Sequence, residues 1–169
     1  LDVFKYDVIN DIYLNETPLE AINTKYHEGV IAFSPTGDTM YFARETYYSK
    51  SYYKDSILKN GSTKEQISVI NLYRATKCTT KEITWKNNGN CNFNKGWYVE
   101  ELEFNSAFFS IKNPAISCDG KTLYYSSDMP GGFGNYDIYK SNINDDGSLG
   151  NPENLGQKIN TEEQEVFPH

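Results

Sequence analysis

A repeated segment restricts the fold of this chain more than any other feature. Residues 30–42, Val-Ile-Ala-Phe-Ser-Pro-Thr-Gly-Asp-Thr-Met-Tyr-Phe, align without gaps with residues 113–125, Asn-Pro-Ala-Ile-Ser-Cys-Asp-Gly-Lys-Thr-Leu-Tyr-Tyr. In both copies a short apolar run precedes a turn that contains Gly, and a run of β-branched and aromatic residues follows. Gly suits such a turn because it adopts positive φ angles without steric cost. Each copy therefore predicts a β-hairpin.

A second element occurs three times. It consists of an Asx residue, an aliphatic residue, an aromatic residue and a cation, at 2–5, 71–74 and 137–140. Successive side chains of a strand point to opposite faces of a sheet. We therefore expect the aliphatic residue and the cation on one face, and the Asx and the aromatic residue on the other.

A third element also occurs three times, always after the second one. It consists of an apolar residue, Asn and a hydroxyl residue, at 22–24, 104–106 and 159–161. A glutamate follows the first and third copies at the same offset, as Glu28 and Glu165. Chance can repeat one motif, but it rarely repeats three motifs in one order.

The order of these elements predicts the domain organisation. Units of about 50 residues with three or four strands are typical of β-propeller blades. We therefore predict an all-β chain that forms an arc of a β-propeller, about two full blades plus parts of two more, with loop insertions in one blade. The predicted parts are the end of one blade (1–24), a blade with insertions (28–106), a blade (113–161) and the start of the next (165–169). Because a closed ring needs four or more blades, we expect the arc to belong to a larger propeller.

The composition allows an aromatic core and argues against two classes of partner. The chain has 14 Tyr, 9 Phe and 2 Trp, and its formal net charge is −7. Nucleic acid is not expected as a partner, because phosphate neutralisation requires an electropositive face. The apolar runs are far shorter than the roughly 20 residues that span a bilayer, so no direct membrane insertion is expected in this segment.

The insertions in the first full unit lie between its second and third strands, at about 45–66, and between its third and fourth strands, at 78–94. Insertions in repeat proteins lie in loops, where binding residues concentrate. Tyr gives a large contact area at a small entropic cost. We therefore predict partner-binding residues in the first insertion, with the alternative that its tyrosines extend a hairpin and pack on one another: Tyr47, Tyr48, Tyr52 and Tyr53.

Three cysteines allow at most one internal disulfide. Cys78 and Cys91 bracket a polar stretch that predicts a hairpin with Asn88 and Gly89 at its tip. In such a hairpin the two cysteines would face each other and could pair in an oxidising compartment. The alternative is that both are plain thiols. Without a Cys-x-x-Cys pair, and with only two histidines, a zinc site is not expected.

A search for catalytic groups predicts that the segment is not an enzyme. His27 and His169 are the only imidazoles, and no Gly-x-Ser-x-Gly elbow accompanies them. We expect His27 to be held in a contact between blades, and we predict no catalytic residue and no cofactor. The positions of the two first strands that would face a central channel carry side chains that we expect to be inert: Val30, Ala32, Asn113 and Ala115.

One segment shows part of the spacing of a calcium-binding loop. Asn142, Asn144, Asp146 and Gly147 follow that spacing, and Glu153 stands where the bidentate acid would be. However, the first ligand would be a neutral amide and no helices are expected to flank the loop. We therefore predict a hairpin turn here and no metal site.

Residues 113–139, with the turn at Ser117-Cys118-Asp119-Gly120, resemble the WD40-like, TolB-type propeller repeat. The run from Gly131 to Thr161 is similar to blades in OmpA-family envelope proteins of Bacteroidetes. In those proteins such propellers stand beside tetratricopeptide repeats and a peptidoglycan-binding domain, and some belong to the type IX secretion and gliding apparatus. The resemblance is strong over 113–169, moderate over 1–44 and weak over 45–100. Cys118 stands where the repeat usually has Pro, and Thr36 where it has Asp.

The resemblance implies a non-catalytic protein–protein interaction scaffold in the bacterial cell envelope, in the periplasm or associated with the outer membrane. Its partners would be other envelope proteins, and type IX secretion or gliding machinery is one setting. Peptidoglycan contact is expected only through domains that are not present here. Two alternatives stay open: a fragment of a propeller enzyme of the lyase or peptidase-associated kind, and a glycan-binding propeller.

Overall fold

The computed structural model describes residues 2–9, 12–49, 66–78 and 96–169. Within these residues the chain forms ten strands and no helix, and every pair of neighbouring strands is antiparallel. The prediction of an all-β fold is confirmed.

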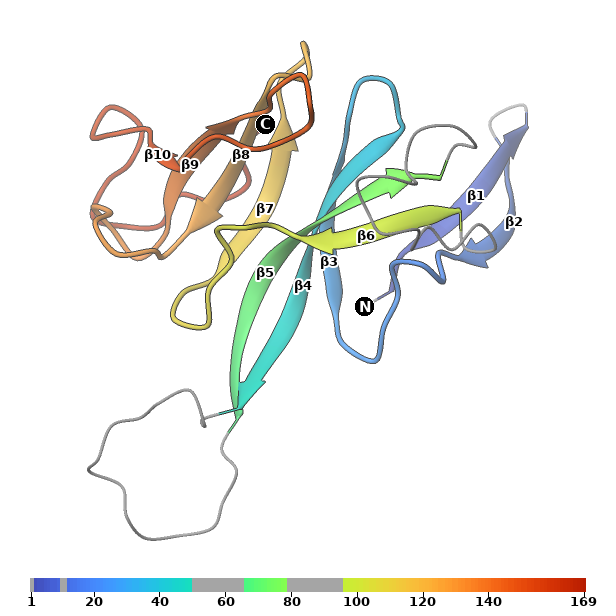
Figure 1. Cartoon of the computed structure of the whole chain (residues 1–169), viewed down its shortest axis with the longest axis horizontal. Helices are drawn as coiled ribbons and strands as arrows, with labels where there is room; N and C mark the ends of the chain where they lie inside the picture. The colour runs from blue at the N-terminus through green and yellow to red at the C-terminus, as the bar shows by residue number, and fades with distance from the viewer. Residues whose placement is uncertain (1, 10–11, 50–65, 79–95) are drawn as a thin grey trace, which may run out of the picture.

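The ten strands form three sheets, each with its strands in chain order (Figure 1). The first sheet pairs β1 (Phe4–Ile9) with β2 (Ile12–Pro18). The second sheet contains β3 (Glu28–Phe33), β4 (Thr39–Ser49), β5 (Gln66–Lys77) and β6 (Trp97–Glu101). The third sheet contains β7 (Ile111–Ile116), β8 (Thr122–Ser127), β9 (Asp137–Asn142) and β10 (Glu153–Asn154).

The two predicted hairpins are β3–β4 and β7–β8, and their turns are built alike. Gly37 and Gly120 adopt φ angles of 68° and 73°, which a side chain would disfavour. The amide of Gly37 donates to the carbonyl of Ser34 at 2.9 Å, and the amide of Gly120 donates to the carbonyl of Ser117 at 2.8 Å. The repeated sequence therefore folds into a repeated turn, and both predicted hairpins are confirmed.

The second and third repeated elements bind each other. Asn160 Oδ1 accepts a hydrogen bond from the amide of Ile138 at 2.8 Å, and Asn160 Nδ2 donates to the carbonyl of Ile138 at 3.0 Å. The side-chain amide thus pairs with a strand backbone as a neighbouring strand would. We call this arrangement the asparagine clamp. The same two hydrogen bonds join Asn105 to Leu72 and Asn23 to Val3.

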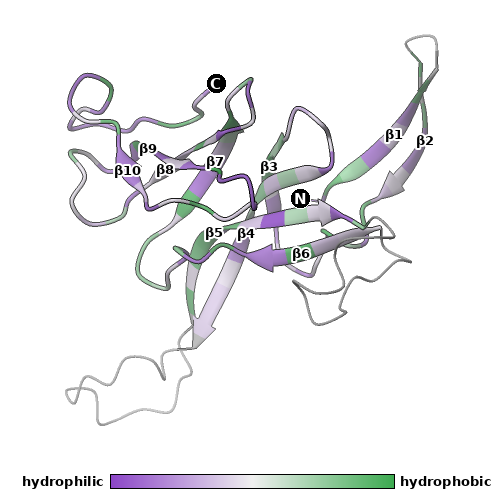
Figure 2. Ribbon diagram, turned by 45° about the horizontal axis from the view of Figure 1, so that its top comes forward, coloured by the Kyte–Doolittle hydropathy of each residue, from purple (hydrophilic) through white to green (hydrophobic). Residues whose placement is uncertain are grey.

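Two apolar clusters lie on opposite faces of the second sheet. One contains Leu72 and packs the second sheet against the third; the other contains Tyr73 and packs the second sheet against Leu19 and Ile22, which follow β2. Adjacent residues of β5 therefore face opposite clusters, as the alternation predicted, and Figure 2 shows polar and apolar segments alternating along several strands. The first cluster is aromatic at its centre, where the ring of Tyr125 stacks on those of Phe104 and Tyr139.

Candidate functional site

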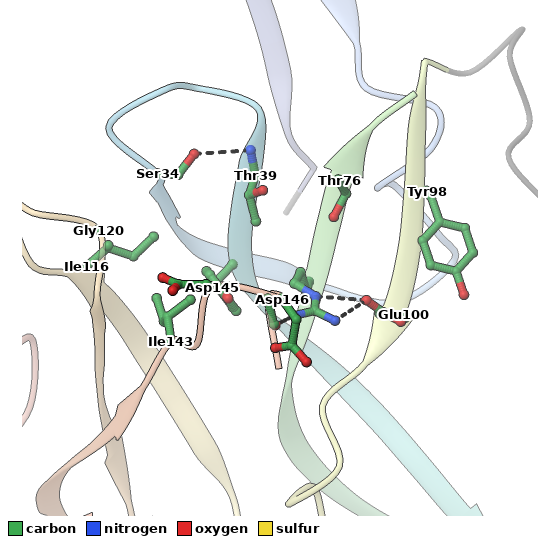
Figure 3. A pocket seen from close by; sticks show the side chains of 13 residues that line it. Ser34, Thr39, Thr76, Tyr98, Glu100, Ile116, Gly120, Ile143, Asp145 and Asp146 are labelled. Atoms are coloured by element: carbon green, nitrogen blue, oxygen red, sulfur yellow. Dashed lines mark hydrogen bonds and ion pairs between the residues drawn. The ribbon is translucent and has the colours of Figure 1, made fainter. Parts of the chain in front are cut away.

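Two pockets lie between the second and third sheets, at opposite ends of β4 and β5. The first, which we call the Arg74 pocket, has a volume of about 500 Å³ (Figure 3). It lies beside the β3–β4 turn and the β9–β10 turn. Its polar lining comes from both sheets: Tyr41, Arg74, Tyr98 and Glu100 from the second, and Asp145 and Asp146 from the third.

Arg74 joins the two sheets in this pocket. Because Arg74 of β5 lies opposite Glu100 of β6, both side chains project from the same face of the sheet. Arg74 Nε donates to Glu100 Oε1 at 2.7 Å, and Nη1 donates to the carbonyl of Gly147 in the β9–β10 turn. Burial lowers the pKa of Arg74, but the Glu100 carboxylate more than offsets this effect, so the pKa stays above its usual value. The guanidinium is therefore permanently charged.

The other groups of the Arg74 pocket are weak candidates for catalysis. Burial raises the pKa of both Tyr41 and Tyr98, so the two phenols stay protonated at neutral pH. Asp146 Oδ1 accepts hydrogen bonds from the amide and the hydroxyl of Ser148 at 2.9 and 2.7 Å. The contacts of Arg74 and Asp146 hold the two sheets and the turn in place. The polar groups of the Arg74 pocket therefore act as structural contacts between the two sheets.

Replacing Arg74 with Met is expected to lower the free energy of unfolding by about 2 kcal/mol, because a half-buried carboxylate and a carbonyl lose their donor. Lys140, the equivalent cation of the third sheet, pairs with Glu153 at 3.3 Å, and the Glu153 side chain is largely exposed to solvent. Lys140→Met should therefore cost less than about 0.5 kcal/mol. Urea unfolding of both variants measures the difference, and equal losses would contradict the inter-sheet role of Arg74.

The segment with partial calcium-loop spacing forms the turn between β9 and β10. Ser148 donates to Asp146, as described above, and Asn144 Nδ2 donates to the Ser148 hydroxyl at 2.9 Å. Glu153 forms its ion pair with Lys140. The predicted hairpin turn is confirmed. The described residues contain no group of three or more His, Cys, Asp or Glu side chains that could hold a metal ion.

The structure describes two of the four predicted partner-binding tyrosines, and both lie in β4. Tyr47 is 38% exposed, and its ring stacks on Tyr26 with the centroids 4.9 Å apart. The Tyr48 hydroxyl accepts a hydrogen bond from Asn71 Nδ2 at 2.7 Å. Both residues thus belong to the extended part of the β4–β5 hairpin, which was the alternative interpretation of the four tyrosines. Partner binding stays a prediction, and two members lie outside the described residues: Tyr52 and Tyr53.

The cysteines differ in state. Cys78 follows β5 and is disulfide-bonded. Cys91 and the predicted hairpin around Asn88 and Gly89 lie outside the described residues, so the pairing of Cys78 with Cys91 stays a prediction. Cys118, in the β7–β8 turn, is a free and exposed thiol.

The second pocket, which we call the Asn113 pocket, has a volume of about 570 Å³. It is lined by the start of β3, the end of β4, the start of β5 and the start of β7. His27 belongs to this lining. His169 lies outside it, with its Nδ1 atom 3.2 Å from the carbonyl oxygen of Phe167. Sequence reasoning treated Asn113 as inert and missed both pockets.

Comparisons of the chain with family models, curated proteins and solved structures found no match. Across the described ranges, no helix has the length and apolar character that crossing a membrane requires. The fold and the two pockets define a protein of stacked antiparallel sheets whose polar sites lie between sheets.

Proposed function

We propose that this chain is an arc of a β-propeller and serves as a non-catalytic protein–protein interaction scaffold in the bacterial cell envelope. Three observations support the propeller. The two four-stranded sheets have the same strand order, each contains an asparagine clamp, and an apolar cluster packs the second and third sheets against each other. These features are those of blades arranged around an axis.

The observation that carries the scaffold role is the length of the β4–β5 hairpin. β4 has 11 residues and β5 has 12, whereas the equivalent strands β8 and β9 have six each. The extra length carries the hairpin beyond the rest of its sheet (Figure 1). A rigid hairpin that projects from a stacked core and exposes Tyr47 provides a preorganised contact surface.

The envelope location has two supports. Disulfides persist in oxidising compartments such as the periplasm, and Cys78 is disulfide-bonded. The second support is the resemblance of residues 131–161 to propeller blades of OmpA-family envelope proteins. A place in type IX secretion or gliding machinery rests on that resemblance alone.

A photo-cross-linking residue at position 47 of the full-length protein, in intact cell envelopes, tests the scaffold role. We expect irradiation to give a covalent adduct with another envelope protein, identified by mass spectrometry. The matched control is the same residue at Thr36, an exposed position in the β3–β4 turn at the opposite end of the sheet. No adduct at position 47, or the same adducts at both positions, would contradict an interaction surface on this hairpin.

A further inference from the structure

The Asn113 pocket has walls that the fold holds rigidly. Ser110 stands immediately before β7, and its hydroxyl accepts a hydrogen bond from the amide of Ile70 in β5 at 3.1 Å. Ser127 of β8 donates to the carbonyl of Ser110 at 2.8 Å. Ser110 thus ties the third sheet to the second along one side of the pocket. The volume of about 570 Å³ lies within the range of small-molecule binding pockets.

Asn113 is the most unusual residue of this pocket. Its φ angle is 53°, in the left-handed region, and it lies in an irregularity of the β7–β8 pairing between Lys112 and Ala115. Such bulges re-aim a side chain, and strained backbone is retained where the surroundings require it. Asn113 is 7% exposed, and its Oδ1 atom has no hydrogen-bond partner. A buried amide oxygen without a donor is costly, so a donor from outside the chain, a water molecule or a ligand hydroxyl, is expected to pair with this atom.

The formal charges of the acidic and basic residues that line the pocket sum to zero. Glu28 Oε1 pairs with Arg44 Nε at 3.0 Å. Glu45 accepts a hydrogen bond from the Ser68 hydroxyl at 2.6 Å, which lowers the pKa of that carboxyl and keeps it ionised. Lys112 supplies the second cation, and its Nζ lies 3.5 Å from the centre of the Tyr136 ring. With two carboxylates and two cations in the described lining, no net charge selects a charged ligand.

Part of the remaining lining is aliphatic. Val30 and Ile70 provide an apolar surface beside the polar groups of Glu45 and Asn113. A ligand that fits must be uncharged, must donate hydrogen bonds and must also present C–H groups. A sugar ring has this combination, since hydroxyl groups surround its edge and C–H groups cover its faces.

We propose that the Asn113 pocket binds a neutral sugar residue, with one hydroxyl donating to Asn113 Oδ1, a second hydroxyl donating to Glu45, and a C–H face against Val30 and Ile70. This inference does not rest on the scaffold role, because the pocket lies between the sheets and does not use the hairpin tyrosines.

The test uses the purified full-length protein, four separate neutral probes (glucose, galactose, mannose and N-acetylglucosamine) and glucuronate as an anionic comparison. Saturation-transfer NMR and calorimetry at millimolar sugar concentrations detect affinities in the range expected for one sugar ring. We expect at least one of the four to bind. No binding of any probe would overturn the proposal, and so would binding of glucuronate alone, because that result would assign the pocket to anions through Lys112.

Two variants locate the binding. Asn113→Gly removes the amide and tolerates the positive φ, and we expect it to weaken sugar binding about tenfold or more. Glu45→Gln keeps the shape of a half-buried side chain, and we expect a loss of about threefold. Thr76→Val, in the Arg74 pocket, is the matched control and should leave the affinity unchanged. If Asn113→Gly fails to fold, Glu45→Gln decides; unchanged affinity in the folded variants would overturn the proposal.

Discussion

Replacing Asn160 with Ala is expected to lower the free energy of unfolding by about 3 kcal/mol, because two backbone groups of a buried strand residue lose their partners together. Asn160 is 2% exposed and makes both hydrogen bonds of its clamp with Ile138. It also donates to Asn154 Oδ1 at 2.8 Å, and Asn154 in turn donates to Asp137. The substitution therefore leaves several buried polar atoms without partners, and water has little access to replace them.

The measurement is urea unfolding followed by tyrosine fluorescence, with two comparison variants. Asn151→Ala changes an exposed residue near the β9–β10 turn and should alter the stability by less than about 0.5 kcal/mol. Asn23→Ala removes a clamp that is only half buried, and we expect an intermediate loss because water can reach Val3. If Asn160→Ala costs no more than Asn151→Ala, the clamp is not a stabilising feature of the unit.

The features that the sequence predicted correctly are local. The hairpin turns follow from Ser, Gly and β-branched residues at fixed short offsets, and Gly37 and Gly120 adopt the positive φ that their position required. The opposite orientations of Leu72 and Tyr73 follow from the two-residue period of a strand. Each of these depends on residues within about one turn or one strand, so the pattern contains the necessary information.

The features that the sequence did not show depend on register between distant segments. Arg74 meets Glu100 because β5 and β6 pair in one register, and the 19 residues between the two strands, 78–96, hide that register in the sequence. The bulge at Asn113 is equally invisible, because a regular strand would place this residue differently. The three Asn residues were recognised as a repeat, but their binding to the third strand requires the folded unit.

The connection between β8 and β9 depends on Gly134 for a different reason from the glycines of the turns. A side chain on Gly134 would collide with the carbonyl of Glu163 and would lie 2.6 Å from the carbonyl of Thr161. The amides of Phe133 and Gly134 both donate to the Asp137 carboxylate, at 2.6 and 3.0 Å. The buried carboxylate of Asp137 therefore anchors this loop through its amides. The backbone of residues 161–163, which follow Asn160, packs closely against Gly134.

Gly134→Ala is accordingly expected to lower the free energy of unfolding by about 3 kcal/mol, at the upper end of overpacking effects, since the atoms it would strike are backbone. Gly150→Ala is the matched control: its added carbon would lie 3.5 Å from Asn142 Cβ, an ordinary contact, so its effect should stay within about 0.5 kcal/mol. Thermal and urea unfolding of both variants measure the difference. A loss in Gly134→Ala as small as in Gly150→Ala would mean that the loop moves aside, and the segment after Asn160 would then not be pressed against it.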